Sequence, residues 1–217
     1  MFATTLSSTF RRTVLALALA AGASLAHAAT LHVELDTSGF AGLVGGCWLD
    51  LTFAAGSGGN AVPAQAVLSL LSGFDAGQAA QIDGHVTGSL ATGYTLDNSV
   101  PADLFQAVHF GGKVEFDVNV SGAIDPSLDS KAVFAATLYG ADQMTLLGNS
   151  ANGSLLQLIW TPAAVTGQQG SVAATVYDNS IATVAAVPEP SSWLMLGAGL
   201  ALVGLMARRK QGAALAA

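Results

Sequence analysis

Apolar and polar residues alternate one by one through most of the chain between residues 29 and 187. In residues 113–121, for example, Val114, Phe116 and Val118 are each separated by a polar residue. Because successive side chains of a β-strand point to opposite faces, this period predicts strands with one apolar and one polar face. The same alternation predicts further strands at residues 31–36, 47–53, 82–90, 134–139, 155–161, 172–177 and 181–187.

Short stretches rich in Gly, Asn, Asp and Pro separate these runs, as expected for turns between strands. They lie at residues 56–60, 97–98, 111–112, 125–126, 152–153 and 178–179. Residues 64–71 fit either a helical turn or a buried strand, and we interpret them as a strand. Many short strands joined by turns predict an all-β domain over residues 29–186, an antiparallel β-sandwich of a jelly-roll-like kind.

The first 28 residues contain the parts of a secretory signal peptide in the expected order. Arginines at positions 11 and 12 provide a positive start, and residues 14–25 form a short apolar segment. Ala26 and Ala28 then present the small side chains that signal peptidase requires before its cleavage site. We therefore expect an exported protein whose mature chain begins at Ala29.

Residues 187–210 combine a proline-rich boundary, an apolar segment and a basic cluster. Two prolines flanking a glutamate interrupt both strands and helices. We predict that residues 193–207 form a single transmembrane helix, although 15 apolar residues are fewer than the roughly 20 that usually span a bilayer. By the positive-inside rule the basic cluster remains cytoplasmic, followed by a short trailer at residues 211–217. The motif residues are Pro188, Glu189 and Pro190, and the basic residues are Arg208, Arg209 and Lys210.

This three-part tail resembles the PEP-CTERM sorting signal of exported bacterial proteins. The resemblance covers roughly the last 25 residues and rests on the order of the motif, the apolar segment and the basic cluster. It implies a substrate of exosortase, a membrane protease-transpeptidase, with Pro188, Glu189 and Pro190 as the recognition element. It also implies transient anchoring in the inner membrane and an association with exopolysaccharide and biofilm.

The body itself is similar to one uncharacterised β-sandwich family of PEP-CTERM exported proteins. The similarity rests on Asp36-Thr37-Ser38-Gly39, on residues 49–53 and on residues 146–158. The sequence departs from that family at Gly45-Gly46-Cys47-Trp48, where a cysteine is unexpected. The resemblance implies no catalytic residue for this chain.

Composition changes its meaning once these segments are separated. The whole chain is 52% hydrophobic and 10% charged, with a net charge of −7. Residues 29–187, however, contain 13 Asp or Glu and 2 Lys, which gives the body a net charge of −11. An acidic body excludes nucleic acid as a partner, because phosphates require Lys and Arg. A lone cysteine excludes an intramolecular disulfide.

Candidate ligand residues are scattered rather than grouped in a recognised motif. His32, His85 and His109 could bind a metal only if the fold brought them together, and we interpret them as separate surface residues. Calcium binds carboxylate and amide oxygens, but the loop residues of this kind lack calcium-loop spacing, so we expect no cofactor and keep calcium as an alternative. Those loop residues are Asp97, Asn98, Asp125, Asp129, Asp178 and Asn179.

Cys47 lies on the apolar face of its predicted strand, and we expect it to be buried as a small hydrophobe. A sugar-binding platform could be lined by aromatic side chains, although packing in the core is the alternative use of each. The body retains Glu34 and Glu115 as its only glutamates, which sequence alone cannot place as a glycosidase pair. The candidate aromatic residues are Trp48, Tyr94, Trp160 and Tyr177.

These observations favour a non-enzymatic exported protein of the cell envelope or extracellular matrix. Its expected partners are signal peptidase and exosortase as processing enzymes, extracellular polysaccharide, and the inner membrane before processing. The chain contains no Gly-x-Ser-x-Gly, His-Glu-x-x-His or phosphate-loop motif. A carbohydrate-binding module, assisted by calcium, is the second hypothesis, and a secreted hydrolase is the third.

Overall fold

The computed structural model describes residues 30–43, 45–56, 62–123, 130–148, 151, 153–163, 165, 170–187 and 197–199. The chain divides into two units, and Ala28–Val187 forms the unit that contains the sheets. In the other unit, residues 1–27 and 188–217, the described residues 197–199 are helical. The predicted signal peptide, the Pro188-Glu189-Pro190 motif, the basic cluster and most of segment 193–207 therefore lie outside the described residues.

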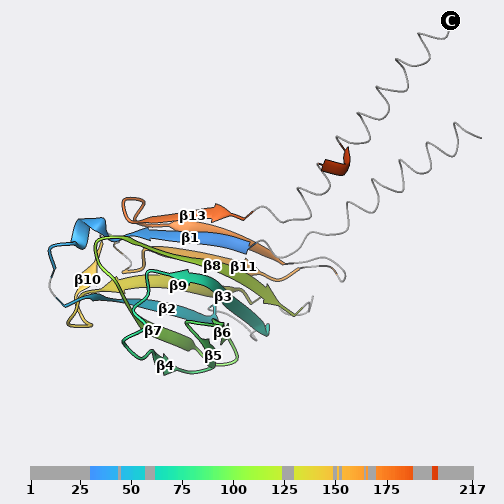
Figure 1. Cartoon of the computed structure of the whole chain (residues 1–217). Helices are drawn as coiled ribbons and strands as arrows, with labels where there is room; N and C mark the ends of the chain where they lie inside the picture. Colours follow the sequence, from blue (N-terminus) through green and yellow to red (C-terminus); the bar gives the residue numbers. More distant parts are fainter. Residues whose placement is uncertain are drawn as a thin grey trace, which may run out of the picture. The chain divides into compact units, whose positions relative to one another are not determined.

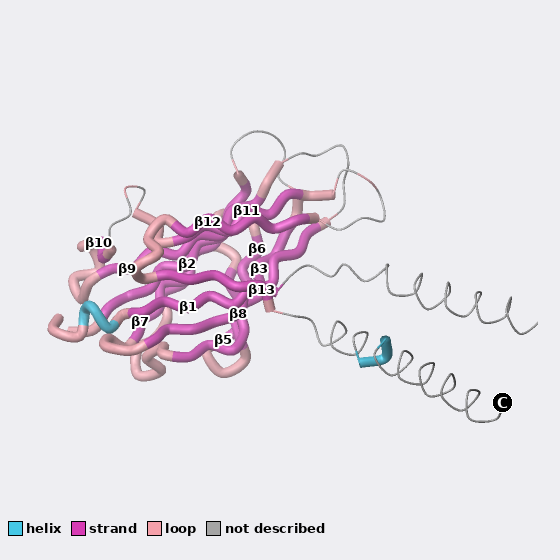
Figure 2. Tube along the Cα trace, turned by 90° about the horizontal axis from the view of Figure 1, so that it is seen from above, coloured by secondary structure: helices cyan, strands magenta, loops and turns pink. Residues whose placement is uncertain are grey.

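The body is all-β, with two antiparallel sheets (Figures 1 and 2). Within the described residues, sheet A has six strands in the order β13 (Ala182–Ala186), β1 (Thr30–Asp36), β8 (Lys113–Gly122), β3 (Ala64–Ser72), β6 (Gly93–Asp97) and β5 (Val86–Ser89). Sheet B has seven strands: β12 (Ser171–Val176), β11 (Leu156–Thr161), β9 (Ala132–Tyr139), β2 (Cys47–Ala55), β7 (Ala102–Val108) and β4 (Gln81–Asp83), with β10 (Leu146–Leu147) paired to β9.

The two sheets bury their apolar faces against each other in one sandwich-like core. Phe116 of β8 in sheet A and Phe134 of β9 in sheet B are both fully buried, with ring centroids 6.4 Å apart. Phe74, in the segment after β3, packs edge-on against Phe116 at 6.1 Å. Burial of each such ring contributes roughly 1.5–3 kcal/mol, so this aromatic contact is a main connection between the layers.

The alternating pattern is confirmed in β1, β2, β8 and β9. Every second residue of β2 and β9 is buried, and the residues between them are half-buried on the outer face. The interpretation of residues 64–71 as a strand is also confirmed, since β3 covers Ala64–Ser72. A register shift between Ser69 and Ser72 interrupts β3, where Leu70 has a positive φ of 52°.

The prediction of one strand over residues 82–90 is wrong. The structure divides this segment into β4, which pairs with β7 in sheet B, and β5, which pairs with β6 in sheet A. Gly84 lies at the break with a φ of 70°, and a Cβ there would lie 2.0 Å from the carbonyl oxygen of Pro101. Only glycine allows this close approach of two backbones, so the chain changes sheets here.

A short 3-10 helix, Ser38–Phe40, follows β1. It begins after Thr37, which is fully buried although it is polar. The Thr37 hydroxyl donates to the carbonyl oxygen of Gly112 at 2.7 Å, and the Thr37 amide donates to the same oxygen at 2.8 Å. These bonds connect the turn after β1 to the loop before β8 and satisfy a buried hydroxyl.

Candidate functional site

Three aromatic side chains meet on the outer face of sheet B. Trp48 of β2, Phe105 of β7 and Tyr139 of β9 are half-buried, and we call them the aromatic cluster. The rings of Trp48 and Phe105 are stacked, with centroids 5.1 Å apart and an interplanar angle of 10°. Tyr139 meets Phe105 edge-on at 5.7 Å and 66°. Large aromatic rings gathered outside the core form a rigid surface with solvent-accessible edges or faces.

Two carboxyl groups lie beside this cluster on the same face. Asp50 of β2 pairs with Phe105 across to β7, and Asp103 pairs with Thr52. Asp50 and Asp103 are therefore diagonal neighbours on adjacent antiparallel strands, an arrangement in which side chains reach each other. Asp103 also contributes to the raised pKa of Asp50, and we call the two residues the carboxyl pair.

The carboxyl pair retains a proton near neutral pH. Burial raises the pKa of Asp50 to about 7, and the charge of Asp103 and the hydrogen bond between the two groups act in the same direction. A neighbouring carboxylate disfavours ionisation of Asp50, so Asp50 keeps its proton to a higher pH than a solvated aspartate does. The pKa of Tyr139 is also raised, mainly by burial and further by Asp50 and Asp103.

The carboxyl pair has no cationic partner among the described residues. The Oδ1 atoms of Asp50 and Asp103 are both buried, and neither accepts a hydrogen bond from a protein donor in the described part of the chain. Elsewhere among the described residues, Lys113 Nζ forms a salt bridge with Glu34 Oε1 at 2.7 Å, and His32 Nδ1 lies within hydrogen-bond distance of Asp117 Oδ1, also at 2.7 Å. Two acidic groups without a cationic partner in the described part of the chain thus lie next to three aromatic rings.

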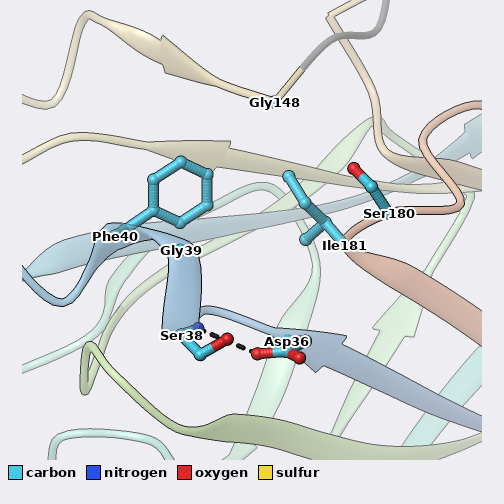
Figure 3. Close-up of a pocket in the computed structure, with 7 residues that line it drawn as sticks. All are labelled: Asp36, Ser38, Gly39, Phe40, Gly148, Ser180 and Ile181. Atoms are coloured by element: carbon cyan, nitrogen blue, oxygen red, sulfur yellow. Dashed lines mark hydrogen bonds between the residues drawn. The ribbon is translucent and has the colours of Figure 1, made fainter.

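A pocket of about 380 Å³ lies beside the 3-10 helix (Figure 3). Asp36 faces Ser38 there, and the Ser38 amide donates to Asp36 Oδ1 at 2.9 Å. This bond and that of the Ser38 hydroxyl lower the pKa of Asp36. Ser180, across the pocket, donates from its amide to Asp178 Oδ1 at 3.1 Å. The polar groups of the pocket are thus engaged in their own turns, with Phe40 and Ile181 as its apolar side.

The tail of the chain matches a known family model. Residues 186–210 match the PEP-CTERM protein-sorting motif. The chain carries a PEP-CTERM sorting motif. The match begins at Ala186, the last residue of β13, and implies an exported protein that an exosortase processes. No curated protein and no solved structure is significantly similar to this chain, so the proposed resemblance of the body to a β-sandwich family stays a prediction.

The sorting motif accounts for the tail but leaves the candidate residues of the body to be placed. The three histidines lie apart and have different neighbours. His32 contacts Asp117, His85 Nδ1 lies 2.7 Å from Ser99 Oγ, and His109 is exposed. No group of three His, Cys, Asp or Glu side chains suitable for a metal occurs within the described residues.

The loop residues considered for calcium mostly serve their own turns. Asn98 is buried: its Oδ1 accepts the Ala64 amide at 2.8 Å, and its Nδ2 donates to the Val62 carbonyl at 2.9 Å. Asp97 accepts the Ser99 amide at 2.8 Å, and Asp178 accepts that of Ser180. Asn179 is exposed, whereas Asp125 and Asp129 lie outside the described residues.

The four aromatic residues proposed as one sugar platform do not lie together. Tyr94 and Trp160 are buried in the core, which is the alternative use that the sequence analysis gave for these residues. Tyr177 is exposed after β12, where its hydroxyl donates to Gln157 Oε1 at 3.0 Å. Trp48 alone belongs to the aromatic cluster. The sequence pattern did not predict β7, the strand that carries Phe105 and Asp103. Its inward-facing Gln106 is buried but polar, so the apolar alternation is interrupted there.

Cys47 is buried in the core, and the two glutamates lie on neighbouring strands of sheet A. The burial predicted for Cys47 is confirmed, and burial raises the pKa of its thiol to about 12. A thiol held in this form is a poor nucleophile. Glu34 of β1 and Glu115 of β8 are directly opposite each other in sheet A, where Glu34 is paired with Lys113.

Proposed function

We propose that the protein is a non-enzymatic component of the cell envelope or extracellular matrix, which an exosortase sorts and processes and which associates with exopolysaccharide. The observation that carries this proposal is the sorting motif at residues 186–210, which begins at the last residue of β13. An exosortase substrate needs a folded domain followed by the sorting motif, and this chain has the two in that order.

The way the body ends supports processing of the tail without unfolding of the sheets. β13 is an edge strand of sheet A, paired only with β1 among the described strands. The last contact of the body is a hydrogen bond from the Val187 amide to the Thr30 carbonyl at 2.9 Å. Pro188 follows at once and cannot donate to a continuing ladder. Cleavage beyond this point removes none of the described core residues, the last of which is Ala182.

The membrane part of the proposal rests on the sequence of the tail. Among the described residues, no helix has the length and apolarity needed to cross a bilayer. The segment proposed to span the membrane, residues 193–207, is described only at residues 197–199. Transient anchoring through this segment, and removal of residues 1–28 by signal peptidase, therefore remain predictions from the residues themselves.

Replacement of Pro188, Glu189 and Pro190 by alanine tests the processing step. We expect the variant to accumulate in the membrane fraction as a larger species, because the recognition element is gone. Pro63→Ala, in a loop of the body, is the matched control and should be processed normally. An alanine variant of the motif with unchanged size and fractionation would contradict processing through this motif.

A second candidate function, a carbohydrate-binding module, is favoured by the aromatic cluster on the outer face of sheet B. The strand order also supports a jelly-roll-like assignment, an architecture common among lectin domains. In that order β1-β8-β3-β6 form one sheet and β2-β7-β4 form the other. Binding to a glycan array with and without EDTA would separate calcium-assisted binding from direct binding, and no binding under either condition would remove this candidate.

The third candidate, a secreted hydrolase, has less support. Glycosidases hold two carboxyl groups about 5 to 9.5 Å apart so that a sugar or a water fits between them. Asp50 and Asp103 lie on the outer face of sheet B and do not line the pocket beside the 3-10 helix. Hydrolysis of polysaccharides by the purified protein, abolished in Asp50→Asn, would overturn this reasoning.

A further inference from the structure

We propose that the aromatic cluster and the carboxyl pair together form a binding site for a sugar that carries a free amino group, as in a deacetylated hexosamine polymer. The inference deepens the proposed association with exopolysaccharide and rests on it. It specifies the place on the body, the outer face of sheet B, and the chemical class of the ligand.

The carboxyl pair lacks a cation among the described residues. Asp50 and Asp103 are half-buried on the outer face of sheet B, and neither takes part in a salt bridge there. Paired acids usually acquire a cation or a set of donors when they leave water. An ammonium group supplies up to three donors and a positive charge at once, which matches what this pair lacks.

The aromatic cluster adjoins the acids, since Asp50 pairs with Phe105 across β2 and β7. Trp48, Phe105 and Tyr139 form a rigid group whose internal geometry is set by stacking and edge contacts. A cation within about 6 Å of an aromatic ring is attracted by the ring quadrupole, most strongly by tryptophan. The apolar face of a sugar ring packs against the same surface. A hexosamine therefore satisfies the rings and the acids together.

The body as a whole is strongly acidic. Between residues 29 and 187 there are 13 Asp or Glu and 2 Lys. One of these lysines, Lys113, is paired with Glu34 in sheet A. Such a surface repels a polymer of uronic or sulfated sugars and attracts a cationic one. Charge complementarity thus favours an amino sugar over an anionic polysaccharide.

Binding of the purified full-length chain to a glucosamine hexamer tests the inference, with the N-acetylated hexamer as the comparison. We expect at least about tenfold tighter binding of the free amine at low salt, and weaker binding as salt rises. Trp48→Ala and Asp50→Asn should each weaken binding by about tenfold or more. The matched controls are Tyr177→Ala, an exposed tyrosine at the end of sheet B outside the cluster, and Asp142→Asn, an exposed acid; both should bind as the unmodified chain does.

Several outcomes would overturn the inference. They are equal affinity for the two hexamers, no binding to either, or affinity unchanged in both Trp48→Ala and Asp50→Asn. Preference for an oligolysine over the glucosamine hexamer would assign the site to a basic protein instead. Failure of the sorting proposal is visible separately, because normal processing of the variant lacking Pro188, Glu189 and Pro190 leaves the binding result untouched.

Discussion

Replacement of Asp50 by asparagine should stabilise the protein at alkaline pH and leave it nearly unchanged at acidic pH. The folded state raises the pKa of Asp50 from 3.8 to about 7, chiefly through burial. The folded chain therefore binds a proton more tightly than the unfolded chain between these values. The contribution of Asp50 to the free energy of unfolding is therefore most favourable below about pH 4 and is lost as the pH rises through about 7. Asparagine keeps the shape and a hydrogen-bonding group but carries no charge.

The size of the effect follows from the pKa interval. Between 3.8 and about 7, at 1.36 kcal/mol per pH unit, the upper bound is about 4 kcal/mol. The Asp50 side chain is only half-buried, and solvent screening reduces such energies considerably. We therefore expect a gain of about 2 kcal/mol for Asp50→Asn above neutral pH.

Urea unfolding of the purified full-length chain and its variant measures this difference at about pH 8 and about pH 4.5. Groups facing Asp50 are Asp103 and Tyr139, with Asp83 opposite Asp103 on β4. They are present in both proteins. The difference between the two proteins therefore isolates Asp50 and its coupling to these neighbours.

The control of opposite sign is Asp142→Asn. Hydrogen bonds from Thr145 and Met144 lower the pKa of Asp142, so removal of that charge should cost stability above the usual pKa of an aspartate and not below its lowered value. A stability difference for Asp50→Asn that is the same at both pH values would refute the reasoning. So would a destabilised variant at about pH 8.

Two further predictions concern the body. Phe116→Ala should lower the free energy of unfolding by about 3–5 kcal/mol, because this ring is fully buried between the sheets; a cost no larger than that of Val100→Ala, at an exposed site, would contradict the packing. Gly88→Ala should lower the thermal midpoint, since its φ is 107° and a Cβ would lie 2.1 Å from the Gly93 carbonyl oxygen, whereas Gly112→Ala meets nothing within 4 Å. Equal midpoints for these two glycine variants would contradict the strained conformation.

Much of the fold was predictable because the alternation of side chains is a local property. β2 and β8 bury every second residue in the pattern that residues 47–53 and 113–121 predicted, with Asp117 as an extra buried residue. Alternation predicts the strands wrongly where the chain passes from one sheet to the other or where a polar residue is buried. At Gly84 the alternating segment 82–90 divides between the two sheets. In β7 the inward-facing Gln106 interrupts the apolar face, and its amide donates to the carbonyls of Asp75 and Gln78.

The sorting motif is the other feature that the sequence alone determined, since three parts in fixed order at residues 186–210 need no tertiary contact to be recognised. The candidate site, in contrast, depends on tertiary contacts. Trp48 and Asp50 are near each other in the chain, but Phe105 and Asp103 reach them only because β7 pairs with β2 in one particular register. Alternation specifies which face a side chain occupies, whereas strand order and register depend on contacts between distant segments. Those contacts bring two acids together with no cationic partner in the described part of the chain, an arrangement that depends on the folded sheet.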